Sequence, residues 1–108
     1  MKYFILSCFI LLVKLLISQT YTIKGTVKDS VNGEDVYGAT IKVLELENAG
    51  AKTNTYGFYS LTLEKGTYTL LYRSRGFAPK KYIVELNKNI SKNIELGPSK
   101  DFQNIEEV

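Results

Sequence analysis

The sequence predicts an all-β fold, a sandwich or barrel of six or seven short strands, behind a removable N-terminal segment. Two observations support this fold class. Apolar and polar residues alternate with a period of two along most of residues 19–97, and no long stretch there has a helical period. Turn residues such as Gly, Asn and Pro separate the alternating runs at spacings of roughly 8–12 residues, which is typical of sandwiches and barrels.

The first 18 residues have the layout of a secretory signal peptide. Lys2 gives a positive start, residues 3–17 are almost wholly apolar, and Ser18 begins a small and polar exit. Lys14 interrupts the apolar run, which is also shorter than the roughly 20 residues that a membrane-spanning helix needs. We therefore expect cleavage after Ser18, with a retained anchor helix as the alternative.

The first half of residues 19–97 predicts three strands. Residues 21–28 alternate strictly and indicate a strand with one buried face. Residues 29–38 (DSVNGEDVYG) have the composition of a turn. Residues 39–43 predict a second strand, which ends or bulges at Leu44 and Leu46, and residues 51–54 predict a short edge strand.

The second half predicts a hairpin and two further strands. Residues 59–63 and 68–72 alternate on either side of Glu64-Lys65-Gly66, and two such runs joined by three residues with a glycine indicate a β-hairpin. After a break, residues 82–86 predict the next strand, residues 87–89 a turn, and Ile94 with Leu96 the last strand. Residues 98–108 lack such a pattern and predict a flexible tail.

The composition argues against most enzyme chemistry. The chain has no histidine, and its single cysteine, Cys8, lies in the predicted signal. Residues 19–108 therefore lack the commonest general base, the usual zinc ligands and a thiol nucleophile. The acidic clusters fall in predicted turns, strand ends or the tail, and we interpret them as solvated surface charge: Glu34-Asp35, Glu45, Glu47 and Glu106-Glu107. We expect no enzyme activity, no cofactor and no bound metal.

The charge balance gives no sign of a nucleic-acid partner. Without Lys2 and Lys14, 12 of the 14 basic residues remain against 11 acidic ones, and the two signs are interspersed. A nucleic-acid-binding domain usually carries a basic stripe instead.

The aromatic residues fall into two groups. Five tyrosines lie on predicted inward faces, where core packing is expected: Tyr21, Tyr59, Tyr68, Tyr72 and Tyr82. Tyr37, Tyr56 and Phe58 lie in or beside predicted loops and are the candidates for partner binding, with ordinary loop packing as the alternative.

Five short motifs resemble, in order and spacing, the carboxypeptidase-regulatory-like domain. They are residues 23–29 (IKGTVKD), 36–41 (VYGATI), 55–61 (TYGFYSL), 65–70 (KGTYTL) and 75–77 (RGF). The resemblance covers about residues 21–96 and implies a Greek-key β-sandwich of the transthyretin (prealbumin) kind, without a peptidase active site. One departure is that Asn54-Thr55-Tyr56 stands where the family usually has an acidic residue, which bears on loop-specific binding but not on the fold.

The tail suggests a setting for such a domain. In TonB-dependent outer-membrane receptors of the SusC/RagA type, found in Bacteroidetes, this domain follows the signal peptide and precedes a TonB-box-like stretch, a plug and a barrel. Leu96-Gly97-Pro98 followed by Ile105, Glu106, Glu107 and Val108 is similar to the start of that junction. A TonB box acts by adding an extended strand to a partner's sheet edge.

The resemblance thus implies a non-catalytic accessory module of a nutrient receptor in a Gram-negative bacterium. It would lie in the periplasm, associated with the outer membrane. Its partners would be the receptor plug and barrel and a TonB-type energy-coupling protein. The alternative is an independent periplasmic or surface module for binding or adhesion, which recognises a glycan or peptide through its loop aromatics. The sequence leaves open whether the chain is part of a larger receptor or a free-standing relative.

Overall fold

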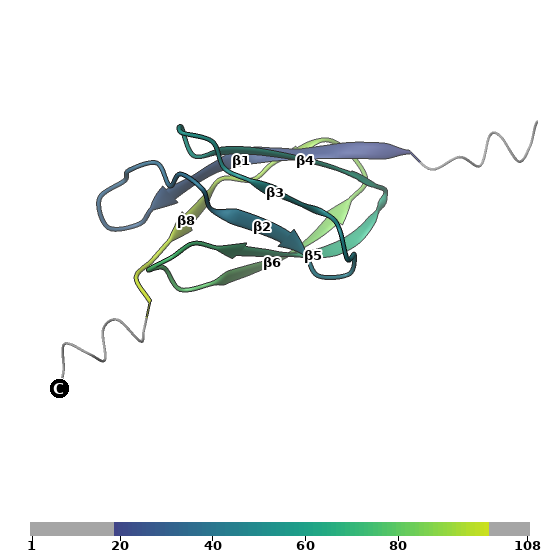
Figure 1. Ribbon diagram of the computed structural model, residues 1–108. Coiled ribbons are helices and arrows are strands. Elements are labelled where there is room, and N and C mark those ends of the chain that lie inside the picture. Colours follow the sequence, from purple (N-terminus) through teal and green to yellow (C-terminus); the bar gives the residue numbers. More distant parts are fainter. Residues whose placement is uncertain (1–18, 100–108) are drawn as a thin grey trace, which may run out of the picture.

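The computed structural model describes residues 19–99, which form two β-sheets packed face to face (Figure 1). Within these residues there is no helix. The strands are β1 (Thr20–Asp29), β2 (Thr40–Val43), β3 (Gly50–Lys52), β4 (Phe58–Glu64), β5 (Gly66–Arg73), β6 (Lys80–Leu86), β7 (Ile90–Ser91) and β8 (Ile94–Leu96). The predicted signal, residues 1–18, and most of the predicted tail lie outside the described residues.

The two sheets confirm the predicted β-sandwich. One sheet has the order β4-β1-β7, with β8 also paired to β1, and the other has the order β3-β2-β5-β6. The chain passes between sheets from β1 to β2, from β3 to β4, from β4 to β5 and from β6 to β7. Such repeated crossing is typical of Greek-key sandwiches. The second strand ends at Val43, so Leu44 and Leu46 lie in an exposed turn.

The predicted hairpin around Gly66 is wrong. β4 pairs with β1 along its whole length, whereas β5 lies in the other sheet between β2 and β6. Both edges of β5 are therefore occupied, and neither is left for β4. Alternation shows only that each strand has one buried face, and this holds equally for a hairpin and for a connection between two sheets. The Lys65 N–H donates to the Gln19 carbonyl at 2.8 Å, which ties this connection to the start of β1.

The C-terminal strands also differ from the prediction. Two short strands, β7 and β8, pair parallel with β1, where only residues 94–96 were expected to form a strand. They are interrupted at Lys92 and Asn93. The Lys92 N–H donates to the Lys24 carbonyl at 2.8 Å, and the Asn93 Oδ1 accepts the Thr26 N–H at 3.1 Å. A side-chain amide thus replaces a backbone acceptor where the ladder breaks.

The core fills the space between the sheets. Its buried members come from both inner faces: Ile23, Val27, Val36, Ala39, Ile41, Val43, Tyr59, Leu61, Leu63, Leu70, Tyr72, Leu86, Ile94 and Leu96. Of the five tyrosines predicted to face inward, Tyr59 and Tyr72 are fully buried, and Tyr21, Tyr68 and Tyr82 are partly buried against this cluster.

A short hydrogen-bonded chain satisfies the two buried phenols. The Tyr59 hydroxyl donates to the Lys92 carbonyl at 2.6 Å, so the Tyr72 hydroxyl donates to the Tyr59 oxygen at 2.7 Å. Burial raises the pKa of both Tyr59 and Tyr72 above the ordinary value, and both therefore stay neutral donors.

Candidate functional site

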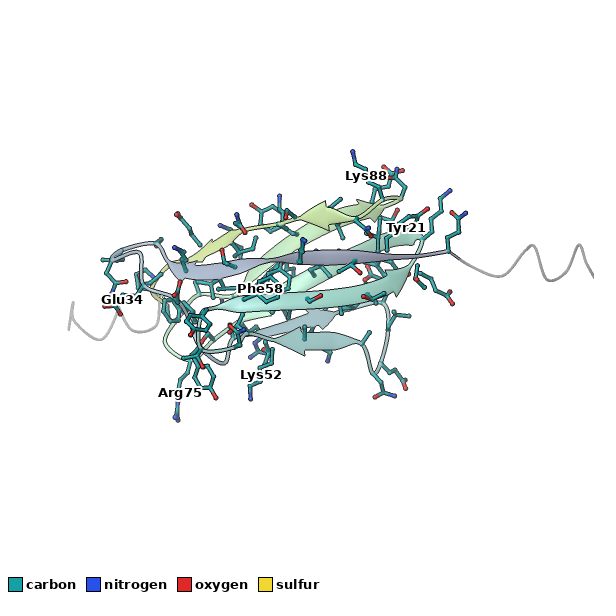
Figure 2. All side chains as sticks on the ribbon, turned by 90° about the horizontal axis from the view of Figure 1, so that it is seen from above. Tyr21, Glu34, Lys52, Phe58, Arg75 and Lys88 are labelled. Carbon is teal, nitrogen blue, oxygen red and sulfur yellow. The ribbon has the colours of Figure 1, made fainter. Side chains whose placement is uncertain are left out.

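Three loops meet at one end of the sandwich, which we call the loop end. They connect β1 to β2, β3 to β4 and β5 to β6. Figure 2 shows Glu34 and Arg75 at this end and Tyr21 and Lys88 at the opposite end. All three predicted binding aromatics lie in these loops or beside them.

The first loop is fixed from its inner side by Thr53. The Thr53 hydroxyl donates to the Val36 carbonyl at 2.6 Å and accepts the Ala39 N–H at 2.8 Å. Thr53 is 3% exposed, and the Val36 N–H donates to the Val27 carbonyl at 2.9 Å. Tyr37 lies between these anchored residues with 71% of its surface exposed. The backbone that carries this ring is therefore held in place while the ring itself faces solvent.

The second loop is fixed by Asn54 and Gly57. The Asn54 Oδ1 accepts the N–H groups of Tyr56 at 2.9 Å and Phe58 at 3.0 Å, which is a turn typical of Asn and Asp. Gly57 has a φ of +72°, and a Cβ there would lie 2.6 Å from the Val27 carbonyl oxygen, so only glycine fits. Tyr56 is 75% exposed. Asn54 belongs to the segment that departs from the family pattern, and its amide oxygen accepts the hydrogen bonds that fix this loop.

A recess of about 360 Å³ opens beside Tyr37. Its lining combines one cation, three acids and aromatic edges, from Asp29, Glu34, Asp35, Val36, Tyr37, Ser74, Arg75 and Phe77. The Lys28 Nζ lies 3.9 Å from the Asp35 Oδ1, and both side chains are nearly half exposed, so this ion pair contributes little stability. The charged rim is therefore accessible for contact with another molecule.

The structure brings together only part of the predicted set. Tyr37 lines the recess, and Tyr56 lies on the adjacent loop, because the Thr53 N–H donates to the Ala39 carbonyl at 2.9 Å. Phe58 is the first residue of β4, opposite Thr26, and is 40% exposed at the start of a strand.

Sequence reasoning did not assign Arg75 or the acidic rim to this site. The only available signal was the Arg75-Gly76-Phe77 motif, which we interpreted solely as a turn. The tail candidates Ile105, Glu106, Glu107 and Val108 lie outside the described residues.

The described residues offer non-covalent contacts. Among residues 19–99, no group of three His, Cys, Asp or Glu side chains is placed as metal ligands would be. In the part of the chain that the structure describes, no helix has the length and apolar character needed to cross a membrane. What the loop end presents is exposed aromatic rings beside a mixed-charge recess.

This architecture defines a small β-sandwich domain with a fixed, exposed loop end. The chain belongs to the CarboxypepD_reg-like domain family, whose model matches residues 23–108. The match confirms the family expected from the sequence motifs.

The chain is also similar to parts of larger proteins. It is 36% identical over 78 residues to Bacillopeptidase F of Bacillus subtilis, which covers 71% of this chain but only 5% of that protein. A DUF3823 family protein from Parabacteroides merdae has a TM-score of 0.56 at 17% identity, over 75% of this chain and 47% of that one. The minor pilin GBS52 of Streptococcus agalactiae has a TM-score of 0.54 at 15% identity, over 77% and 46%. At these identities the two solved structures show the shared fold alone.

Proposed function

We propose that this chain is a non-catalytic accessory module of a TonB-dependent outer-membrane nutrient receptor, and that its loop end contacts a neighbouring part of that receptor. The observation that carries the proposal is the exposure of Tyr37 and Tyr56 on two loops whose backbones are fixed. Tyrosine is enriched in protein interfaces because it adds contact area at a low entropic cost. The family match and the resemblance of residues 96–108 to a receptor junction support the receptor setting.

The path of the chain supports contact at this end. The Ala78 N–H donates to the Gly97 carbonyl at 2.9 Å, and the Ser99 N–H donates to the Gly76 carbonyl at 3.1 Å. Pro98 forms an isolated bridge with Phe77. Residues 97–99 are thereby attached to the loop that carries Arg75. Residue 99, the last that the structure describes, therefore lies at the loop end beside Gly76.

A non-catalytic role agrees with the side chains that are present. The whole chain has no histidine. Among the described residues, the fully buried ionisable groups are Tyr59 and Tyr72, and their hydroxyls are committed to the core. Among residues 19–99, every Asp and Glu side chain is at least partly exposed.

The test uses the chain joined in frame to a plug and barrel receptor. Tyr37→Ser with Tyr56→Ser removes both rings at the loop end. The matched control, Leu44→Ser with Leu46→Ser, changes two partly exposed apolar residues in the turn after β2, at the opposite end. We expect the tyrosine variant to lower uptake of the transported nutrient with unchanged barrel levels, and the control to leave uptake intact. Normal uptake after deletion of residues 21–96 would refute the accessory role.

The proposal also places the protein in the periplasm after export. The charged start and apolar run of residues 1–17 predict cleavage between Ser18 and Gln19. Intact-mass measurement of protein exported from a Gram-negative host should give a chain that begins at Gln19. A mass that still includes Met1 would contradict export by this route.

A second candidate is an independent module that binds a glycan or peptide for adhesion. The mixed-charge recess beside Tyr37 and the structural likeness to a minor pilin favour it. Purified protein would then bind immobilised glycans or peptides without any receptor, and Tyr37→Ser would remove that binding. A reading frame that continues into a plug and barrel would favour the receptor module instead.

A further inference from the structure

The outer edge of β6 is a surface that the proposed function does not use. β6 is the last strand in the order β3-β2-β5-β6, and among the described residues no strand pairs with its other side. Ile83 lies in the middle of this strand and is 76% exposed. Ile83 is therefore an exposed apolar residue beside an unpaired strand edge, and such an edge is a template for pairing with another chain.

The backbone of Ile83 points toward the open edge. Ile83 is paired with Thr69 of β5. The Thr69 N–H donates to the Glu45 Oε1 at 2.7 Å, and its carbonyl accepts the Leu44 N–H at 3.0 Å, both on the β2 side. Because a strand residue directs both backbone groups to one side, Thr69 faces away from β6 and the Thr69–Ile83 pair is not hydrogen-bonded. The N–H and carbonyl of Ile83 therefore face outward, and with a period of two so do those of Lys81 and Glu85.

The charges of the same three residues are self-complementary about Ile83. Lys81, Ile83 and Glu85 alternate with half-buried Tyr82 and Val84, so their side chains share the outer face of the sheet. In an antiparallel pair of β6 strands centred on Ile83, each Lys81 lies opposite a Glu85 and Ile83 lies opposite its own copy. Opposite charges directly across an antiparallel pair are favourable.

We propose that a second copy of this chain is the partner of this edge, with the two β6 strands paired antiparallel about Ile83. The outward backbone groups are those of Lys81, Ile83 and Glu85, so each of the facing pairs exchanges both of its N–H···O bonds. The two sheets of order β3-β2-β5-β6 join into one continuous sheet. The interface is isologous, because both copies use the same strand, and two-fold dimers of this kind are the commonest homo-oligomers.

The inner side of the edge is compatible with this arrangement. On that side Tyr82 meets Val84 of the copy, next to a groove of about 250 Å³ between β6 and β7 that Ile90 also lines. These partly buried residues gain further cover in the dimer. Lysines on an edge usually oppose strand pairing, but here each Lys81 meets a Glu85 rather than another lysine.

The test is a concentration series of the purified full chain in sedimentation velocity. We expect a monomer–dimer equilibrium that Lys81→Glu, and separately Glu85→Lys, weakens by roughly tenfold or more, because like charges then face each other. The double variant, Lys81→Glu with Glu85→Lys, should restore it. Lys24→Glu on β1 is the control for net charge. Circular dichroism melts check that each variant is folded.

A cross-link gives a second readout. In a Cys8→Ser background, Ile83→Cys should form a disulfide-linked dimer on oxidation, because Cα atoms in a hydrogen-bonded pair are about 5.5 Å apart, within disulfide range. Tyr37→Cys in the same background should not. A chain that stays monomeric at all concentrations, or a dimer that is indifferent to both single charge reversals, would overturn the proposal. Association that is lost on deletion of residues 100–108 and survives charge reversal would assign the dimer to the tail.

Discussion

Gly25 leaves less room for a Cβ than any other glycine of the chain, so Gly25→Ala has a sharp structural consequence. Gly25 lies on β1 opposite Tyr59, where the Lys92 carbonyl turns inward between β7 and β8. A Cβ on Gly25 would lie 1.9 Å from the Lys92 oxygen and 2.6 Å from its carbonyl carbon. Ordinary carbon–oxygen contacts are about 3.3 Å or longer, so the Lys92 segment must move by more than about 1 Å.

The cost follows from what holds Lys92 in place. Its N–H donates to the Lys24 carbonyl, and its oxygen accepts the Tyr59 hydroxyl, which is buried. Each bond contributes about 1 kcal/mol net, and a buried hydroxyl left without a partner costs about 1–3 kcal/mol. With some overpacking strain in addition, we expect Gly25→Ala to lower the free energy of unfolding by about 3–5 kcal/mol. A domain of this size has about 4–12 kcal/mol in total, so the loss is a large fraction.

Gly76→Ala is the matched control. Gly76 has a φ of +85° and nothing within 4 Å of its would-be Cβ, so this change costs only backbone strain. That strain is about 1–2 kcal/mol for an L-residue in the left-handed region. Urea titrations of the two variants should differ in midpoint with equal slopes. If Gly25→Ala lowers the free energy of unfolding no more than Gly76→Ala does, the Lys92 carbonyl can move away at little cost. The close approach to Gly25 would then not constrain the fold.

Two further changes test the hydrogen-bonded core and the pH dependence. In urea titrations, Tyr59→Phe should lower the free energy of unfolding by about 2–3 kcal/mol, because the Lys92 carbonyl loses its donor and the Tyr72 hydroxyl loses its acceptor. Tyr72→Phe should lower it by only about 1 kcal/mol, because the Tyr59 hydroxyl still donates to Lys92. Equal losses for the two variants would contradict the order of donors. Hydrogen bonds donated by the Thr69 backbone and then its hydroxyl lower the pKa of Glu45 below its ordinary value. The stability that Glu45 contributes is therefore present above that ordinary value and is lost as the pH falls through the lowered folded-state pKa. The difference in unfolding midpoint between the wild type and Glu45→Gln should therefore shrink on acidification, and a difference that is constant with pH would refute this role.

The sequence predicted the strands much better than their arrangement. Alternation identifies the buried face of a strand, and Ile23, Val27, Leu61 and Tyr72 are buried as expected. It carries no information about which sheet a strand joins. Residues 64–66 therefore have the pattern of a hairpin although they connect the two sheets. β7 was not predictable because two residues are too few to show a period. Asn89 and Asn93 flank this strand, and their side-chain oxygens accept the N–H groups of Thr22 and Thr26 of β1.

Of the candidate site, only the exposure of its aromatic residues was predictable, because single residues decide it. Tyr37 and Tyr56 stand beside turn glycines in the sequence, and both are exposed. The recess joins residues of one segment, Asp29 and Glu34, to Arg75, which lies more than 40 residues further along the chain, and they meet only through the sandwich topology. Local pattern has no means of bringing them together.

The motifs that indicate the family separate the residues that build the loop end from those that the fold leaves free. In the VYGA motif, Val36 and Ala39 are buried and held by Thr53, while Tyr37 between them touches solvent. In the TYG motif, Gly57 is required by its φ and by the Val27 carbonyl, while Tyr56 is exposed. Each motif therefore combines positions that build the loop with one position that the fold leaves free. The fixed positions preserve the backbone whatever side chain stands beside them. If the loop end binds a partner as proposed, residues 37 and 56 can therefore change without loss of the sandwich.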